Sequence, residues 1–132
     1  MKRITILIVL VVLNCFTFGS MHLRGGIVGG DLALGIDSTS AFAKSWYLGY
    51  GAYIHSGSTP ATVFMSFSNP LHNNPAYISF GPMLSLGNTS ALGAYINLGW
   101  ANILSSKDLG LETGIEIINN HSGINLTLVY QL

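Results

Sequence analysis

The sequence predicts an all-β protein, an antiparallel up-and-down meander that closes into a barrel of about eight strands. Apolar residues alternate with small or polar residues in one run after another, as they do in strands with two different faces. The segments between these runs are rich in Gly, Pro, Asn, Asp and Ser, which are the residues of turns. The chain also holds 16 glycines, which disfavour helices because glycine destabilises a helix interior.

The first residues have the three-part pattern of a secretory signal peptide. Lys2 and Arg3 give a positive start, the stretch Ile4–Leu13 is apolar, and smaller or polar residues follow over Asn14–Ser20. The apolar stretch is too short for a transmembrane helix, which needs about 20 residues. We therefore expect this segment to direct export of the chain.

Small residues at Thr17 and Gly19 predict cleavage after Gly19. This gives a signal peptide over residues 1–19 and a single β-barrel domain over residues 20–132. Two alternatives stay open, namely an uncleaved anchor and lipidation of Cys15 at a site that resembles a lipoprotein processing sequence.

The composition excludes several classes of protein. The chain of 132 residues has room for one domain, and only 8% of its residues are charged, whereas a soluble domain has about 25%. Five Lys and Arg cannot form a basic face, so we expect no nucleic-acid partner. A single Cys excludes a disulfide framework and a Cys-based zinc site. Beyond residue 19 the formal charge is −2 and no thiol remains, which suits an oxidising compartment.

The strands follow from the alternation, taken in chain order. An eighth strand is predicted before the clear runs, over Met21–Val28, with Gly29–Gly30 as a tight hairpin turn. Seven runs alternate clearly: Asp31–Asp37, Ser45–His55, Ala61–Ser68, Tyr77–Leu86, Leu92–Trp100, Asp108–Ile117 and Gly123–Leu132.

Two of these runs fit a membrane-spanning barrel less well. Ala61–Ser68 is short for a transmembrane strand of about 9–11 residues. Pro82 lies inside its run and cannot donate a ladder hydrogen bond. A secreted soluble barrel or sandwich therefore stays open, and so does an oligomer in which a seven-stranded sheet closes with other copies.

The two faces of the predicted strands differ in an unusual way. One face carries Leu, Ile, Ala and Val, and the other carries Gly, Ser, Tyr, Asn and Thr with almost no charge. The second face suits the crowded interior of a small closed barrel. The apolar face then contacts lipid, with Trp46, Tyr50, Trp100 and Tyr130 near strand ends as interface aromatic residues.

A short repeat supports the same arrangement of faces. The sequence Gly-Ala-Tyr-Ile occurs at Gly51–Ile54 and again at Gly93–Ile96, with Gly and Tyr on the inner face in both. An inward Tyr ring can cover a glycine on the neighbouring strand and shield its backbone. We interpret the repeat as convergent strand composition.

Taken together, residues 20–132 resemble the bacterial outer-membrane β-barrel class. Members of that class typically end in a strand whose last residue, and the residue two before it, are aromatic or apolar. Tyr130 and Leu132 fit this pattern, with Leu in place of the commoner Phe. The resemblance implies the bacterial outer membrane as the location, and the lipid bilayer and the outer-membrane assembly machinery as partners. A secreted or periplasmic location is the alternative.

The predicted interior holds a small set of polar residues. Glu112 and Glu116 lie about 13 Å apart at about 3.3 Å per residue, which is too far for the carboxylate pair of a glycosidase. Arg24 and Lys44 are the nearest cations in the sequence. We interpret the set as a structural polar network, with ligand or ion selectivity as the alternative. Its members are Asp31, Asn97, Glu112, Glu116 and Asn125.

Catalytic signals are few. His121–Ser122 and His55–Ser56 are adjacent His–Ser pairs in predicted turns, but neighbouring strand residues point to opposite faces. The sequence has no lipase elbow, and its four His have no metal-ligand spacing. We expect no cofactor, no metal and no catalytic residue. A barrel of about eight strands has no aqueous channel, so we do not expect a general porin. A structural or surface-interaction role is favoured, and a lipid-modifying hydrolase on the same scaffold is the alternative.

Overall fold

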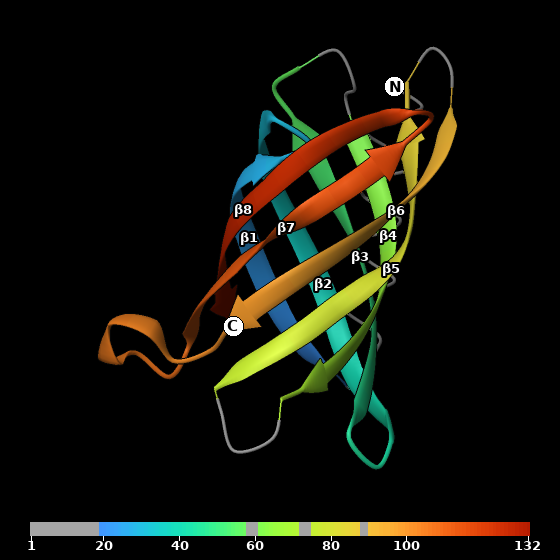
Figure 1. The fold of residues 1–132 in the computed structure, drawn as a ribbon. Helices are drawn as coiled ribbons and strands as arrows, with labels where there is room; N and C mark the ends of the chain where they lie inside the picture. The colour runs from blue at the N-terminus through green and yellow to red at the C-terminus, as the bar shows by residue number, and fades with distance from the viewer. Residues whose placement is uncertain (1–18, 58–60, 72–74, 88–89) are drawn as a thin grey trace.

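The structure, a computed structural model, describes residues 19–57, 61–71, 75–87 and 90–132. Within these ranges the chain forms eight antiparallel strands, each paired with its neighbours in sequence, and β1 pairs with β8 to close the barrel (Figure 1). The strands are β1 (Ser20–Val28), β2 (Asp31–Ala43), β3 (Trp46–His55), β4 (Ala61–Pro70), β5 (Ala76–Leu86), β6 (Ala91–Trp100), β7 (Leu109–Ile118) and β8 (His121–Gln131).

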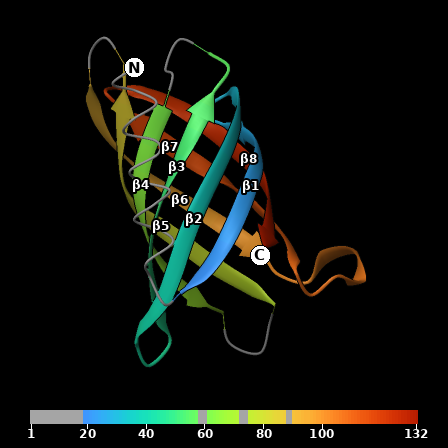
Figure 2. The same ribbon diagram turned by 180° about the vertical axis from the view of Figure 1, so that it is seen from behind.

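The predicted fold class is confirmed, because the barrel is closed and runs up and down. The segment predicted as an eighth strand forms most of β1. Figures 1 and 2 show the strands tilted against the long axis of the barrel, as closure requires. A 3-10 helix at Ile103–Ser105 lies between β6 and β7. Within the described ranges, no helix has the length and apolarity to cross a membrane.

The two ends of the barrel differ in what they carry. The terminal end carries Ser20, Gln131 and the connections β2–β3, β4–β5 and β6–β7; the far end carries the other four connections. Two far-end connections are two-residue turns, Gly29–Gly30 and Asn119–Asn120, whose four φ angles are all positive (63°, 90°, 48° and 67°). Gly and Asn tolerate this backbone, and such turns match the twist of the paired strands.

The barrel is apolar outside and largely polar inside. Leu34 and Leu92 on the outer face are 67% and 75% exposed, whereas Asp37 and Glu112 on the inner face are 0% and 1% exposed. Along each strand the residues that the sequence assigns to the inner face are, with few exceptions, the less exposed ones. The polar side chains are thus buried inside and the apolar ones exposed outside, whereas a soluble barrel has the reverse arrangement.

An apolar plug lies in the half of the barrel toward the far end. It consists of Val28, Ala33, Tyr53, Phe64 and Met83, with Tyr95 and Ile118 packed against it. The Tyr53 and Phe64 rings stack with centroids 5.1 Å apart, and the Tyr95 ring meets Phe64 edge-on at 5.9 Å. Two members of this group, Val28 and Ile118, also line a cavity at the far end of the barrel.

Inward aromatic rings cover glycines on neighbouring strands. Tyr53 lies opposite Gly35, and a side chain at Gly35 would collide with the Tyr53 ring. Tyr77 covers Gly99 in the same way. The glycines therefore make room for rings that fill the narrow interior and shield the backbone.

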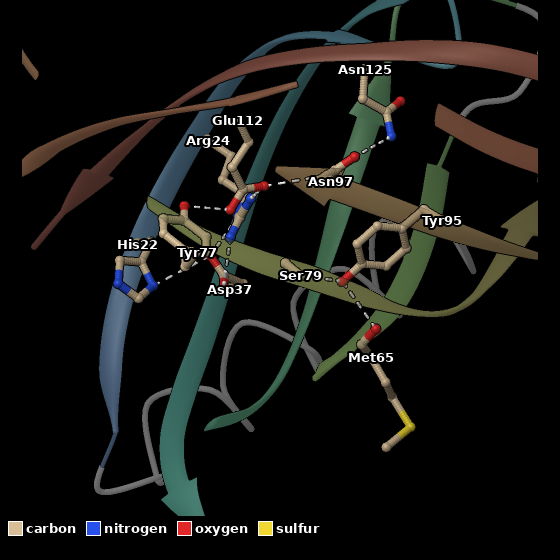
Figure 3. A network of polar contacts seen from close by, with 10 residues as sticks. All are labelled: His22, Arg24, Asp37, Met65, Tyr77, Ser79, Tyr95, Asn97, Glu112 and Asn125. Atoms are coloured by element: carbon tan, nitrogen blue, oxygen red, sulfur yellow. Dashed lines mark hydrogen bonds and ion pairs between the residues drawn. The ribbon is translucent and has the colours of Figure 1, made fainter. Parts of the chain in front are cut away.

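Pro82 lies on the outer face of β5, at a break in the pairing with β4. The pairing runs as far as Phe64 with Met83 and resumes at Phe67 with Phe80. The break leaves the Met65 carbonyl oxygen without a donor from Pro82. The Tyr95 hydroxyl donates to that oxygen instead, at 3.2 Å, from the inside of the barrel (Figure 3).

Gly81 allows the Tyr95 hydroxyl to act as the donor that Pro82 cannot provide. It lies between Tyr95 and the Met65 carbonyl, since it pairs with Tyr95 and a Cβ on Gly81 would collide with the Met65 oxygen. The absence of a side chain lets the Tyr95 hydroxyl reach across β5. A proline in a central strand is thus accommodated without an unpaired carbonyl.

Candidate functional site in the barrel interior

Arg24 on β1 is the centre of the polar interior. Its Nε donates to Asp37 Oδ1 at 2.9 Å, and its Nη1 donates to Glu112 Oε2 at 2.6 Å. The guanidinium also lies over the Phe64 ring, 5.9 Å from the ring centroid. One cation therefore joins two buried carboxylates that lie on opposite sides of it (Figure 3).

Closure of the barrel places these three residues together. Arg24 pairs with Gly35 on β2, two residues from Asp37, and with Val129 on β8. Glu112 lies 88 positions from Arg24 in the chain, but β8 is the single strand between β1 and β7.

Glu112 is saturated with donors. Besides Arg24, the Tyr77 hydroxyl donates to Glu112 Oε1 at 2.7 Å, and the Asn97 amide donates to Oε2 at 3.3 Å. A carboxylate that is 1% exposed is tolerated only when its oxygens are paired in this way. Glu112 therefore holds β1, β5, β6 and β7 together from inside.

The hydrogen bonds continue from Glu112 toward the far end. Asn97 accepts a hydrogen bond from the Asn125 amide at 3.2 Å, and Asn125 Oδ1 accepts from the Gly29 backbone N–H at 3.0 Å. The chain of contacts thus runs from the ion cluster to the β1–β2 turn, and Figure 3 shows it as far as Asn125.

The terminal end holds a cavity of about 380 Å³ next to this cluster. Its lining includes His22, Arg24, Ser66, Tyr77 and Lys107. His22 Nδ1 lies 3.6 Å from Asp37 Oδ1, within ion-pair distance but beyond hydrogen-bond reach. Neither His22 Nδ1 nor Ser66 Oγ has a hydrogen-bond partner in the described residues.

The far end holds a second cavity, of about 340 Å³, with an acidic lining. Asp31 and Glu116 both face it, together with His55 and His121. Glu116 is 7% exposed, and its Oε2 has no hydrogen-bond partner among the described residues. His55 Nε2 is 2.9 Å from the Thr62 hydroxyl.

The space between the two cavities is nearly filled. Its free volume is about 10 Å³, lined by plug residues including Tyr53, Phe64 and Tyr95. A single water needs about 10–15 Å³, so this space admits one water at most. The lumen is therefore a packed interior with two end cavities.

The structure divides the predicted polar network between two places. Asn97, Glu112 and Asn125 lie in one hydrogen-bonded chain, whereas Asp31 and Glu116 line the far-end cavity. Sequence reasoning left out two members of the central cluster, Asp37 and Tyr77, and noted Arg24 only as a nearby cation. Asp37 lies six residues after Asp31 on the same strand. Residues an even number of positions apart share a face, so this spacing places Asp37 on the inner face.

The predicted interface aromatic residues lie on the outer face. Trp46 and Trp100 are at strand ends near the terminal end. The expected position near a strand end is wrong for Tyr50, which lies in the middle of β3. Trp46 meets Phe80 edge-on, with centroids 5.9 Å apart. Tyr130 and Leu132 are exposed, and the Leu132 backbone N–H donates to the Met21 carbonyl.

Other predictions find no further support here. The predicted signal peptide falls on residues 1–18, apart from Gly19, and these residues and Cys15 lie outside the described part. Across the described ranges no three His, Cys, Asp or Glu are grouped as metal ligands. His55 contacts Thr62, and the structure gives no hydrogen bond between His55 and Ser56 or between His121 and Ser122 in those ranges.

Comparison of the chain with protein-family models, curated proteins and solved structures gives no match.

Proposed function

We propose that the protein is a small integral outer-membrane β-barrel with a filled lumen and a structural or surface-interaction role. The observation that carries the proposal is the reversed distribution of side chains. The outer face is apolar and exposed, and the inner face holds a paired ion cluster and a chain of amide hydrogen bonds. A bilayer is the solvent that stabilises this distribution.

The exposed apolar surface supports a lipid environment. Twenty large hydrophobic side chains are exposed among the described residues, and most lie on the outer faces of the strands. Soluble monomers rarely expose apolar patches larger than a few hundred Å² (roughly 300–600 Å² at most). In water this surface would drive association, whereas in a bilayer it contacts acyl chains.

Strand length and closure also suit a membrane span. The strands have 9–13 residues, which matches the roughly 9–11 residues that cross a bilayer when tilted. A closed barrel leaves no edge strand, so every strand can satisfy its backbone groups inside the sheet.

The proposed partners are the bilayer and the assembly machinery of the outer membrane. Tyr130 and Leu132 lie exposed beside β1 and would be available to that machinery. The filled lumen favours a role for the barrel wall and its turns over transport through the interior.

The test is membrane fractionation combined with a gel run before and after heating. We expect the protein in the outer-membrane fraction, with a migration that changes when the sample is boiled, because closed barrels stay folded in detergent until heated. A soluble extracellular or periplasmic protein without this change would overturn the proposal and favour a secreted binding module.

A pair of variants on one strand sharpens this test. Ile96 and Leu92 lie on the outer face of β6, at its middle and near its far end. In a bilayer, Ile96→Arg should destabilise the barrel by about 2–4 kcal/mol and Leu92→Arg by about 0–1 kcal/mol. Urea unfolding in lipid vesicles measures both. Equal and small effects would place the outer face in water, because exposed substitutions there cost within about 0.5 kcal/mol.

A further inference from the structure

The far-end cavity combines volume, negative charge and an unpaired polar atom. Its volume of about 340 Å³ lies in the range of small-ligand sites, roughly 300–1,000 Å³. It is lined by the carboxylates of Asp31 and Glu116, the imidazoles of His55 and His121, and neutral polar groups of Thr62, Ser85 and Asn119.

The cationic side chains of the described residues lie elsewhere. Arg24 is engaged with Asp37 and Glu112, while Lys44 and Lys107 are in connections at the opposite, terminal end. Asp31, Glu116 and His55 line one and the same cavity. The far-end cavity therefore holds two carboxylates that no described Lys or Arg neutralises.

Glu116 is the residue that points to a ligand. It is 93% buried, by its exposure of 7%, and Oε2 has no hydrogen-bond partner within the described ranges. A buried carboxylate oxygen without a partner is costly, and a second carboxylate nearby adds to that cost. A bound cation that donates hydrogen bonds would pair the free oxygen and also offset the repulsion between the two carboxylates.

We propose that the far-end cavity binds a small primary ammonium compound between Glu116 and Asp31. An ammonium group has three donors and can reach two carboxylates and one neutral oxygen at once. Val28, Ala91 and Ile118 give the same cavity an apolar wall that can hold a short alkyl chain. The site requires only the closed barrel, so this proposal can be tested independently of the proposed membrane location.

The experiment titrates butylammonium into the ¹⁵N-labelled full chain in a non-ionic detergent, whose headgroup carries no ammonium. We expect saturable amide shifts around Glu116, Asp31 and Gly123, and none around Lys107 at the terminal end. Butanol, which has the same alkyl chain without the charge, should produce no saturable shift at these positions.

Variants test whether the carboxylates hold the ligand. Glu116→Gln should weaken binding at least tenfold, because it removes a charged hydrogen bond. Asp31→Asn should also weaken binding and serves if Glu116→Gln does not fold. Asp108→Asn, which changes an exposed carboxylate of the β6–β7 connection, should bind as the natural chain does.

Three outcomes would overturn the proposal. Equal binding of butanol would show an apolar cavity without a charge requirement. Equal binding by Glu116→Gln and Asp31→Asn would remove both carboxylates from the site. Calcium that shifts the same amides while butylammonium does not would assign the carboxylates to a metal ion.

Discussion

Glu112 and Glu116 lie on the same inner face of β7, four residues apart, yet their surroundings differ completely. Both are buried, at 1% and 7% exposure. Glu112 accepts from Arg24, Tyr77 and Asn97, whereas Glu116 keeps an unpaired oxygen beside a second carboxylate. Burial alone therefore does not tell what a carboxylate in a barrel does. The partners supplied by other strands decide whether it stabilises the fold or remains available to a ligand.

The largest effect should come from the cation that Glu112 shares with Asp37. Arg24→Met leaves two buried carboxylates without their common partner, so we expect a loss of about 3–5 kcal/mol in the free energy of unfolding. Urea unfolding in detergent, followed by the gel-migration change, measures it. Lys107→Met removes an exposed cation and should stay within about 0.5 kcal/mol of the natural chain. Similar losses in the two variants would contradict the central role of Arg24.

A smaller loss is expected from Glu112 itself. Glu112→Gln keeps the shape and the hydrogen-bonding oxygen but removes the charge that faces Arg24, and Asp37 still pairs the guanidinium. We expect a loss of about 1–3 kcal/mol, measured in the same urea titration. In the Arg24→Met background the same substitution should cost less or stabilise the barrel. If the two losses simply added, the pair would not be coupled.

The smallest effect, and the opposite sign, is expected from Glu116. Glu116→Gln removes a charge that has an unpaired oxygen and a carboxylate neighbour, so the change should range from nothing to a gain of about 1 kcal/mol. Unfolding without any added amine is the proper measurement, because a bound ligand would stabilise only the natural chain. A loss as large as that of Glu112→Gln would show that the two glutamates serve the same purpose.

The strands were predictable from sequence because each strand separates two environments. Asp31–Asp37 and Gly123–Leu132 alternate clearly because every second residue must fit either the crowded interior or the outer face. Met21–Val28 was harder to read, since Arg24 and two glycines interrupt its apolar residues. The Gly29–Gly30 turn provided the signal that completed the barrel.

The interior contacts were less predictable because they depend on register between strands far apart in sequence. Asn97 and Glu112 could be placed on inner faces, but their hydrogen bond requires the pairing of β6 with β7. The role of Arg24 required closure between β1 and β8, which no local pattern encodes. Asp31 and Glu112 are likewise apart because Asp31 begins β2 at the far end, whereas Glu112 lies near the terminal end of β7.

Pro82 restricts which of its neighbouring residues can be replaced during evolution. Pro82, Gly81 and Tyr95 form one hydrogen-bonding unit around the Met65 carbonyl, since the proline removes a donor and the glycine admits its replacement. A change of Tyr95 to Phe alone would leave the Met65 carbonyl oxygen without a hydrogen-bond donor. A larger residue at Gly81 alone would keep the Tyr95 hydroxyl from reaching that oxygen. These three positions should therefore be inherited together, and a lineage that loses the tyrosine should also regain an amide hydrogen at position 82.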